Sequence, residues 1–86
     1  MGSDVWQRVR QGLLDWLGSD QPHDHITEAS RLRDDLGLSS LRVVDLVVSI
    51  EDEFDIAITD EDLASLVTLR DVVETVERKL ADRGDR

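Results

Sequence analysis

The sequence predicts an all-α fold, a four-helix bundle with a short third helix and a long loop between the first two helices. Two observations lead to this prediction. Apolar residues recur at helical spacing in three separate stretches, and aliphatic residues dominate the hydrophobic content without the alternation typical of strands. A chain of 86 residues fits one small domain, which leaves little room for a deep active-site cleft.

The first helix is expected from about Asp4 to Leu17, with Ser3 or Asp4 as its N-cap. The apolar residues at helical spacing in this stretch are Val5, Val9, Leu13, Trp16 and Leu17. Gly18 is placed to end the helix, because glycine adopts the left-handed cap conformation without steric cost.

Residues 18–39 show no sustained period and are expected to form the long loop. The run from Gly18 to Pro22 has the composition of a turn. Isolated apolar residues that can hold the loop against a core are Ile26, Leu32, Leu36 and Leu38. A loop of this length is unusual in a compact domain unless it is functional or anchored.

Residues 40–54 are predicted to form the central helix, with Ser39 as N-cap and Ser40 as the first helical residue. One apolar set falls within a narrow arc of the helix and is expected to face the core: Val43, Leu46, Val47, Ile50 and Phe54. A second set lies among acidic residues on another side: Leu41, Val44 and Val48, with Asp45, Glu51, Asp52 and Asp55. The second set is either an exposed docking strip or a second buried side, and periodicity alone leaves both open.

Ile56 to Ile58 is a short apolar link after the central helix. Thr59 is expected to cap a brief helix from Asp60 to Leu66, whose first turn carries three acids that the helix dipole favours. Thr68 begins a last helix, with Asp71 in a weak form of the capping box. The core spacing of this helix continues through Leu69, Val72, Val73, Val76 and Leu80.

Residues 1–3 are expected to be a vector remnant, residues 4–81 the folded domain and residues 82–86 a polar tail that frays. The amphipathic N-terminus is unlike a signal peptide, and no apolar run approaches the roughly 20 residues of a membrane span. The sequence therefore predicts a soluble, cytoplasmic protein with no membrane contact.

The net charge of −10 is concentrated in residues 40–66, where eight acids accompany a single base, Arg42. Because phosphate contacts need clustered lysine and arginine, this charge argues against a nucleic-acid partner. The negative surplus either steers a basic protein partner or only keeps a small protein in solution.

The residues contain no recognisable catalytic or metal-binding motif. Cysteine, a Gly-rich phosphate loop and a nucleophile elbow are all missing. His23 and His25 are a poor ligand set without a further histidine or cysteine, so no metal site is expected. Ser40 lacks a nearby histidine or lysine base to activate it, so it would have to be the substrate of another enzyme and not a catalyst. The plainer alternative is that Ser39 and Ser40 only begin the helix.

One segment, Asp35-Leu36-Gly37-Leu38-Ser39-Ser40-Leu41, resembles the signature of the acyl carrier protein family. The family's pattern is Asp-Leu-Gly-x-Asp-Ser-Leu, followed by an acidic helix that ends Glu-Glu-Phe. The similarity runs from about Val5 to Leu80 and includes residues 50–56, 58–62 and 68–73. The family's fold is a four-helix bundle, in agreement with the fold predicted above.

The resemblance implies that residues 4–81 are an acyl carrier domain and that Ser40 accepts a 4′-phosphopantetheine arm from coenzyme A through a phosphopantetheinyl transferase, which would make the chain a phosphoprotein. The arm's thiol would hold acyl groups as thioesters for enzymes of polyketide or fatty acid biosynthesis. The chain itself would be a monomeric, non-catalytic carrier. Matched by position, the residues that would contact partners are Leu41, Val44, Asp45, Val48, Glu51 and Asp52. Acyltransferase and ketosynthase partners would present basic docking surfaces.

Two residues depart from the family's pattern. Ser39 replaces the usual Asp before the modified serine and offers a second hydroxyl. Arg42 stands where an acid is common, which would make the partner-contacting side of the helix less negative at its N-terminal end. Both departures favour a polyketide or other natural-product carrier over a fatty acid carrier. A peptidyl carrier protein and an unmodified acidic interaction module stay open as alternatives.

Overall fold

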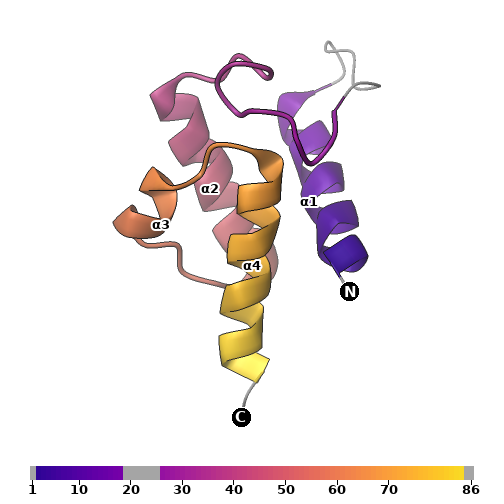
Figure 1. The fold of residues 1–86 in the computed structure, drawn as a ribbon, viewed down its shortest axis with the longest axis vertical. Coiled ribbons are helices and arrows are strands. Elements are labelled where there is room, and N and C mark those ends of the chain that lie inside the picture. Colours follow the sequence, from indigo (N-terminus) through magenta and orange to yellow (C-terminus); the bar gives the residue numbers. More distant parts are fainter. Residues whose placement is uncertain (1, 19–25, 85–86) are drawn as a thin grey trace.

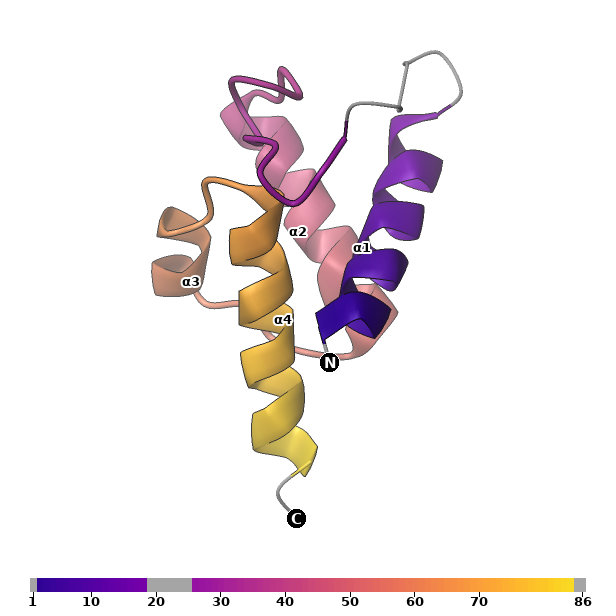
Figure 2. The same ribbon diagram turned by 45° about the vertical axis from the view of Figure 1, so that its right-hand side comes forward.

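Four helices form a bundle in the computed structural model, which describes residues 2–18 and 26–84 (Figure 1). In chain order they are α1 (Gly2–Leu17), α2 (Ser40–Phe54), α3 (Asp60–Ala64) and α4 (Leu69–Gly84). α1 packs against α2 and α4, and the short α3 lies on the side of the bundle away from α1 (Figures 1 and 2). The extended pairing within these residues is one isolated bridge, between Arg31 and Thr68. The prediction of an all-α, four-helix fold with a short third helix is confirmed.

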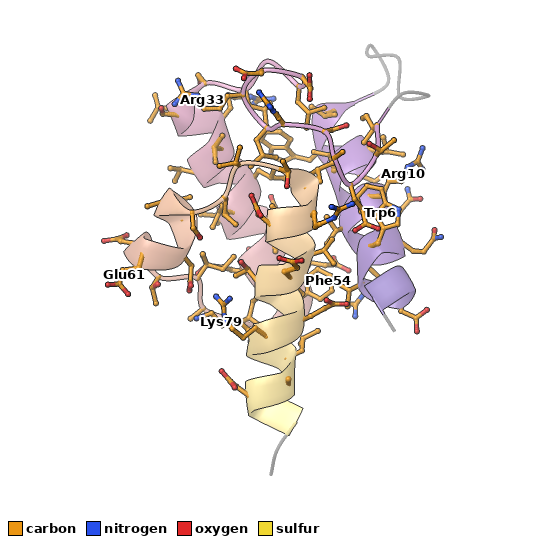
Figure 3. The ribbon with its side chains drawn as sticks, viewed as in Figure 1. Trp6, Arg10, Arg33, Phe54, Glu61 and Lys79 are labelled. Carbon is orange, nitrogen blue, oxygen red and sulfur yellow. The ribbon has the colours of Figure 1, made fainter. Side chains whose placement is uncertain are left out.

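One hydrophobic core joins the three longer helices and the long loop. The apolar set that the sequence places on the core face of α2 is buried, and Phe54 lies between α4 and α1 in Figure 3. The other buried apolar residues are Val9 and Leu13 of α1, Ile26, Leu32 and Leu38 of the loop, and Leu69, Val72, Val73 and Val76 of α4. The predicted core residues Val5, Trp16, Leu17, Leu36 and Leu80 are partly buried against it.

Side-chain caps begin α3 and α4, as predicted. Thr59 Oγ1 accepts the Asp62 N–H at 3.1 Å, and the Asp62 carboxylate accepts the Thr59 N–H at 3.1 Å, which is a complete capping box. Thr68 and Asp71 form the same reciprocal pair before α4. Burial raises the pKa of Asp71, but hydrogen bonds from the N–H groups of Thr68 and Val67 outweigh it and hold that pKa below its ordinary value.

Three helix ends differ from the sequence prediction. α1 begins at Gly2, so neither Ser3 nor Asp4 is its N-cap; Asp4 lies instead in the first turn of the helix, where the helix dipole favours its negative charge. α3 ends at Ala64 instead of Leu66, because the Val67 N–H binds the Asp71 carboxylate and cannot continue the helix. α4 continues past Ala81 to Gly84, since no helix breaker precedes that glycine. Gly18 ends α1 as expected, at φ +86°.

Backbone hydrogen bonds fasten the long loop to the start of α4. The Leu32 N–H donates to the Val67 carbonyl at 2.9 Å, and the Leu69 N–H donates to the Ser30 carbonyl at 3.0 Å. The Arg70 N–H donates to the Glu28 carbonyl at 2.8 Å. With the buried loop residues, these bonds confirm that the loop is anchored. The turn predicted after Gly18 lies outside the described residues.

α3 has no fully buried side chain; Leu63 packs half-buried against the core, and a cluster of ion pairs joins the helix to α4. The Asp62 carboxylate lies 2.7 Å from the Lys79 ammonium and 2.8 Å from the Arg78 guanidinium. Figure 3 shows Lys79 on the side of α4 that faces α3, whereas Glu61 points away from the bundle. The hydrogen bond from Lys79, together with that from the Thr59 N–H, holds the pKa of Asp62 well below its ordinary value of 3.8.

Asp62→Asn should lower the free energy of unfolding by up to about 1 kcal/mol at neutral pH. Because the pKa of Asp62 is lower in the folded than in the unfolded chain, its stabilisation is present above pH 3.8 and is lost as the pH falls below that value. The stability difference between the two proteins, measured by urea unfolding, should therefore shrink below pH 3.8.

Glu61→Gln is the matched control, since it removes an exposed carboxylate from the same turn. Glu61→Gln should change the free energy of unfolding little, both above and below pH 3.8. A difference for Asp62→Asn that stays constant across this pH range would contradict the assignment.

Candidate functional site

A hydrogen-bonded turn leads the loop toward α2. The Asp35 carboxylate accepts the Arg31 N–H at 2.7 Å. The Arg31 carbonyl in turn accepts the N–H groups of Asp35 and Leu36, each at 3.0 Å. This reciprocal arrangement gives Asp35 a structural role before α2, as a side chain that closes its own turn.

Gly37 and Leu38 then direct the chain into the first turn of α2. Gly37 has φ +70°, a left-handed conformation that costs glycine little and other residues more. Leu38 is buried, and its N–H donates to the Leu32 carbonyl at 3.1 Å. The next two residues, Ser39 and Ser40, lie exposed at the start of α2.

The two adjacent hydroxyls have different surroundings. Ser39 is the N-cap of α2, and its Oγ accepts the Arg42 N–H at 3.3 Å. Ser40 is the first residue of the helix, is exposed, and makes no side-chain hydrogen bond to the described residues. No acidic side chain occupies the first turn of α2, although the start of a helix favours negative charge. The exposed Ser40 hydroxyl therefore lies at a helix start that favours negative charge and carries no acid of its own.

The second apolar set of α2 is exposed, so the alternative of a helix buried on two sides is wrong. Leu41, Val44 and Val48 are 79%, 42% and 50% exposed. Asp45 and Asp52 are exposed beside them. We call this surface the exposed strip, and it consists of Leu41, Val44, Asp45, Val48, Glu51 and Asp52.

Glu51 differs from the other acids of the exposed strip. It is half-buried, and its carboxylate accepts the Ile58 N–H at 2.7 Å. Its carbonyl accepts the Ile56 N–H at 3.2 Å. Glu51 therefore fixes the link between α2 and α3. Helical spacing did not indicate this role, because the partner lies beyond the helix.

A further side of α2 faces α1 and carries Arg42 and Glu53. The Arg42 guanidinium lies 4.3 Å from the ring centroid of Trp16, a cation–π contact. At the other end of the helix pair, the Arg8 guanidinium lies 4.4 Å from the ring centroid of Phe54 and 3.4 Å from the Glu53 carboxylate. Arg42 is thus engaged with α1, on a different side of α2 from the exposed strip.

The described residues offer no group of three or more histidine, aspartate or glutamate side chains placed to hold a metal ion. His23 and His25 lie outside the described residues. None of the helices between residues 2 and 84 combines the length and apolar composition of a membrane span.

Comparison with known proteins connects this geometry to a family. The family model described as the phosphopantetheine attachment site matches residues 7–76. An acyl carrier protein of Thermotoga maritima is 38% identical over 77 residues, which cover 90% of this chain and 93% of that protein. One from Exiguobacterium is 43% identical over 72 residues, covering 84% and 89%. The crystal structure of an acyl carrier protein from Thermotoga maritima superposes with a TM-score of 0.78 at 26% identity, covering 94% of this chain and 92% of that one.

Proposed function

The chain belongs to the acyl carrier protein family, whose prosthetic group is 4′-phosphopantetheine, and on that premise we propose that Ser40 is the attachment residue. The observation that carries this proposal is the contrast between the two hydroxyls. The Ser39 hydroxyl caps α2, whereas the Ser40 side chain is exposed and has no hydrogen bond to the described residues.

A phosphopantetheinyl transferase would be the enzyme that modifies the chain. Ser40 Oγ would bond to the pantetheine-bearing phosphorus of coenzyme A, adenosine 3′,5′-bisphosphate would leave, and the hydroxyl proton would pass to the transferase. The bound group supplies a terminal thiol for acyl thioesters, which the cysteine-free chain lacks. The chain's own part is to hold Ser40 outside the core at a helix start that accepts the phosphate charge.

Incubation with coenzyme A and a phosphopantetheinyl transferase should add one phosphopantetheine mass, as read by intact mass spectrometry. Ser40→Ala should abolish the addition. Ser39→Ala is the matched control: it should keep the addition while costing about 1 kcal/mol of stability through the lost cap. Modification that survives in Ser40→Ala and is lost in Ser39→Ala would contradict the proposal and assign the arm to Ser39.

We also propose that the exposed strip binds the transferase and the acyltransferase or ketosynthase that use the carrier. Three exposed aliphatic side chains beside Asp45 and Asp52 suit a partner surface that is apolar at its centre and basic around it. An unmodified interaction module would use the same strip, and it differs in that Ser40→Ala would have no consequence.

Val48→Lys or Asp45→Lys should weaken binding to such a partner about tenfold, in a titration against the transferase or a ketosynthase. Glu74→Lys makes the same charge change as Asp45→Lys at an exposed site on α4, and it should leave the affinity unchanged. Circular dichroism should show both strip variants folded, since their side chains are exposed. Loss of helix in Val48→Lys would mean that the position is structural.

The pathway we propose is polyketide or other natural-product biosynthesis. Its main support is Ser39, which puts a neutral cap where the family usually has Asp. Arg42 adds less, because its guanidinium lies over Trp16 and not in the exposed strip. Intact mass spectrometry of protein from its native host should therefore detect acyl groups that retain keto or carboxyl oxygens. A series of saturated fatty acyl masses would contradict this proposal.

A further inference from the structure

A groove runs between α1 and α2, on the side of α2 that faces α1, and it adjoins the exposed strip at Asp52. Its volume is about 460 Å³. The floor is apolar and comes from both helices: Val9 and Leu13 of α1 and Leu46 and Ile50 of α2 are all buried. A volume of this size is in the range of known ligand-binding pockets.

Two small residues keep the groove open, one on each helix. Gly12 lies in the middle of α1, where a glycine costs about 1 kcal/mol relative to alanine. A Cβ at Gly12 would meet no atom within 4 Å, so packing within the chain does not require this glycine. Ser49 stands across from it on α2 and is exposed. A larger residue at either position would fill the space between the helices.

The rim of the groove is negatively charged. Asp15 of α1 and Asp52 and Glu53 of α2 line it, against one base, Arg8. Arg8 is already paired with Glu53. Two carboxylates, Asp15 and Asp52, are exposed and lie on opposite helices, which suits a cationic side chain placed between them.

The aromatic walls of the groove already hold guanidinium groups. Trp16 and Phe54 line the groove, and the Arg42 and Arg8 guanidinium groups lie over their rings at 4.3 Å and 4.4 Å. These ring faces are therefore already covered by the chain's own guanidinium groups, and a cation of an occupant is left to pair with the exposed carboxylates of Asp15 and Asp52. The combination of an apolar floor and an acidic rim matches an occupant with both aliphatic side chains and arginine.

We propose that this groove is a second docking surface, which takes an arginine-bearing amphipathic helix of a partner protein. Asp52 lines the groove and also belongs to the exposed strip, so one partner can contact both surfaces without a gap. The groove does not require modification of Ser40, and it stands or falls separately from the carrier function.

The test is a titration of the ¹⁵N-labelled full chain with a synthetic amphipathic peptide made of leucine, alanine and arginine, followed by NMR. The amides of Gly12 and Ser49 and the indole N–H of Trp16 should shift in a saturable manner. The same peptide with citrulline in place of arginine should bind at least about tenfold more weakly, because citrulline keeps the shape and removes the charge.

Gly12→Leu should weaken the binding read at Ser49 and Trp16 at least about tenfold, because the leucine fills the groove. Ser49→Leu gives a second block from α2. Gln7→Leu is the matched control, since Gln7 is exposed on α1 and does not line the groove. Val48→Lys should affect shifts in the exposed strip and leave those in the groove. Circular dichroism should confirm that each variant is folded.

Three results would each overturn the proposal. Shifts confined to Leu41, Val44 and Val48 would limit docking to the exposed strip. Equal affinity of the citrulline peptide would remove the case for arginine. Equal shifts with free arginine amide would make the groove a site for small cations and not for a protein segment.

Discussion

The hydrogen bonds between the long loop and the start of α4 determine where α2 begins. The first N–H groups of any helix lack intrahelical acceptors. In α4, the N–H groups of Leu69 and Arg70 donate to the loop carbonyls of Ser30 and Glu28. The loop and α4 therefore each satisfy polar groups that the other leaves open. Leu32, held in this way, presents its carbonyl to the Leu38 N–H, directly before the cap of α2. The position of Ser40 thus depends on contacts with α4, which follows it in the sequence.

α2 has three sides with different surroundings. One side is buried in the core, one is the exposed strip, and one faces α1 through Arg42, Ser49 and Glu53. The core side holds the helix in place, which leaves the other two free to differ in chemistry. The strip is aliphatic and acidic, whereas the side toward α1 combines an acidic rim with cations on aromatic rings. A helix of 15 residues therefore carries two surfaces of different chemistry besides its buried side.

Local patterns predicted the parts of the structure that local physics decides. Helical periodicity identified the core side of α2 and the core residues Leu69, Val72, Val73 and Val76 of α4, because burial follows from which residues share a face. Cap chemistry identified Ser39, Thr59 and Thr68. What the sequence could not indicate depends on distant partners. The bond from Ile58 to Glu51, the contact of Arg42 with Trp16 and the early end of α3 all follow from tertiary structure. The exposure of the second apolar set of α2 likewise depends on where the neighbouring helices pack, which periodicity does not indicate.

Both tryptophans lie in α1, and the chain contains no tyrosine. The near-ultraviolet absorbance and fluorescence of the folded protein therefore come almost entirely from this one helix. Trp16 touches Arg42, two residues after Ser40, so its emission reports on the seam between α1 and the first turn of α2. Circular dichroism, in contrast, averages over all four helices. Unfolding followed by tryptophan fluorescence and by circular dichroism therefore compares one helix with the whole bundle. If the two transitions coincide, α1 unfolds together with the other helices.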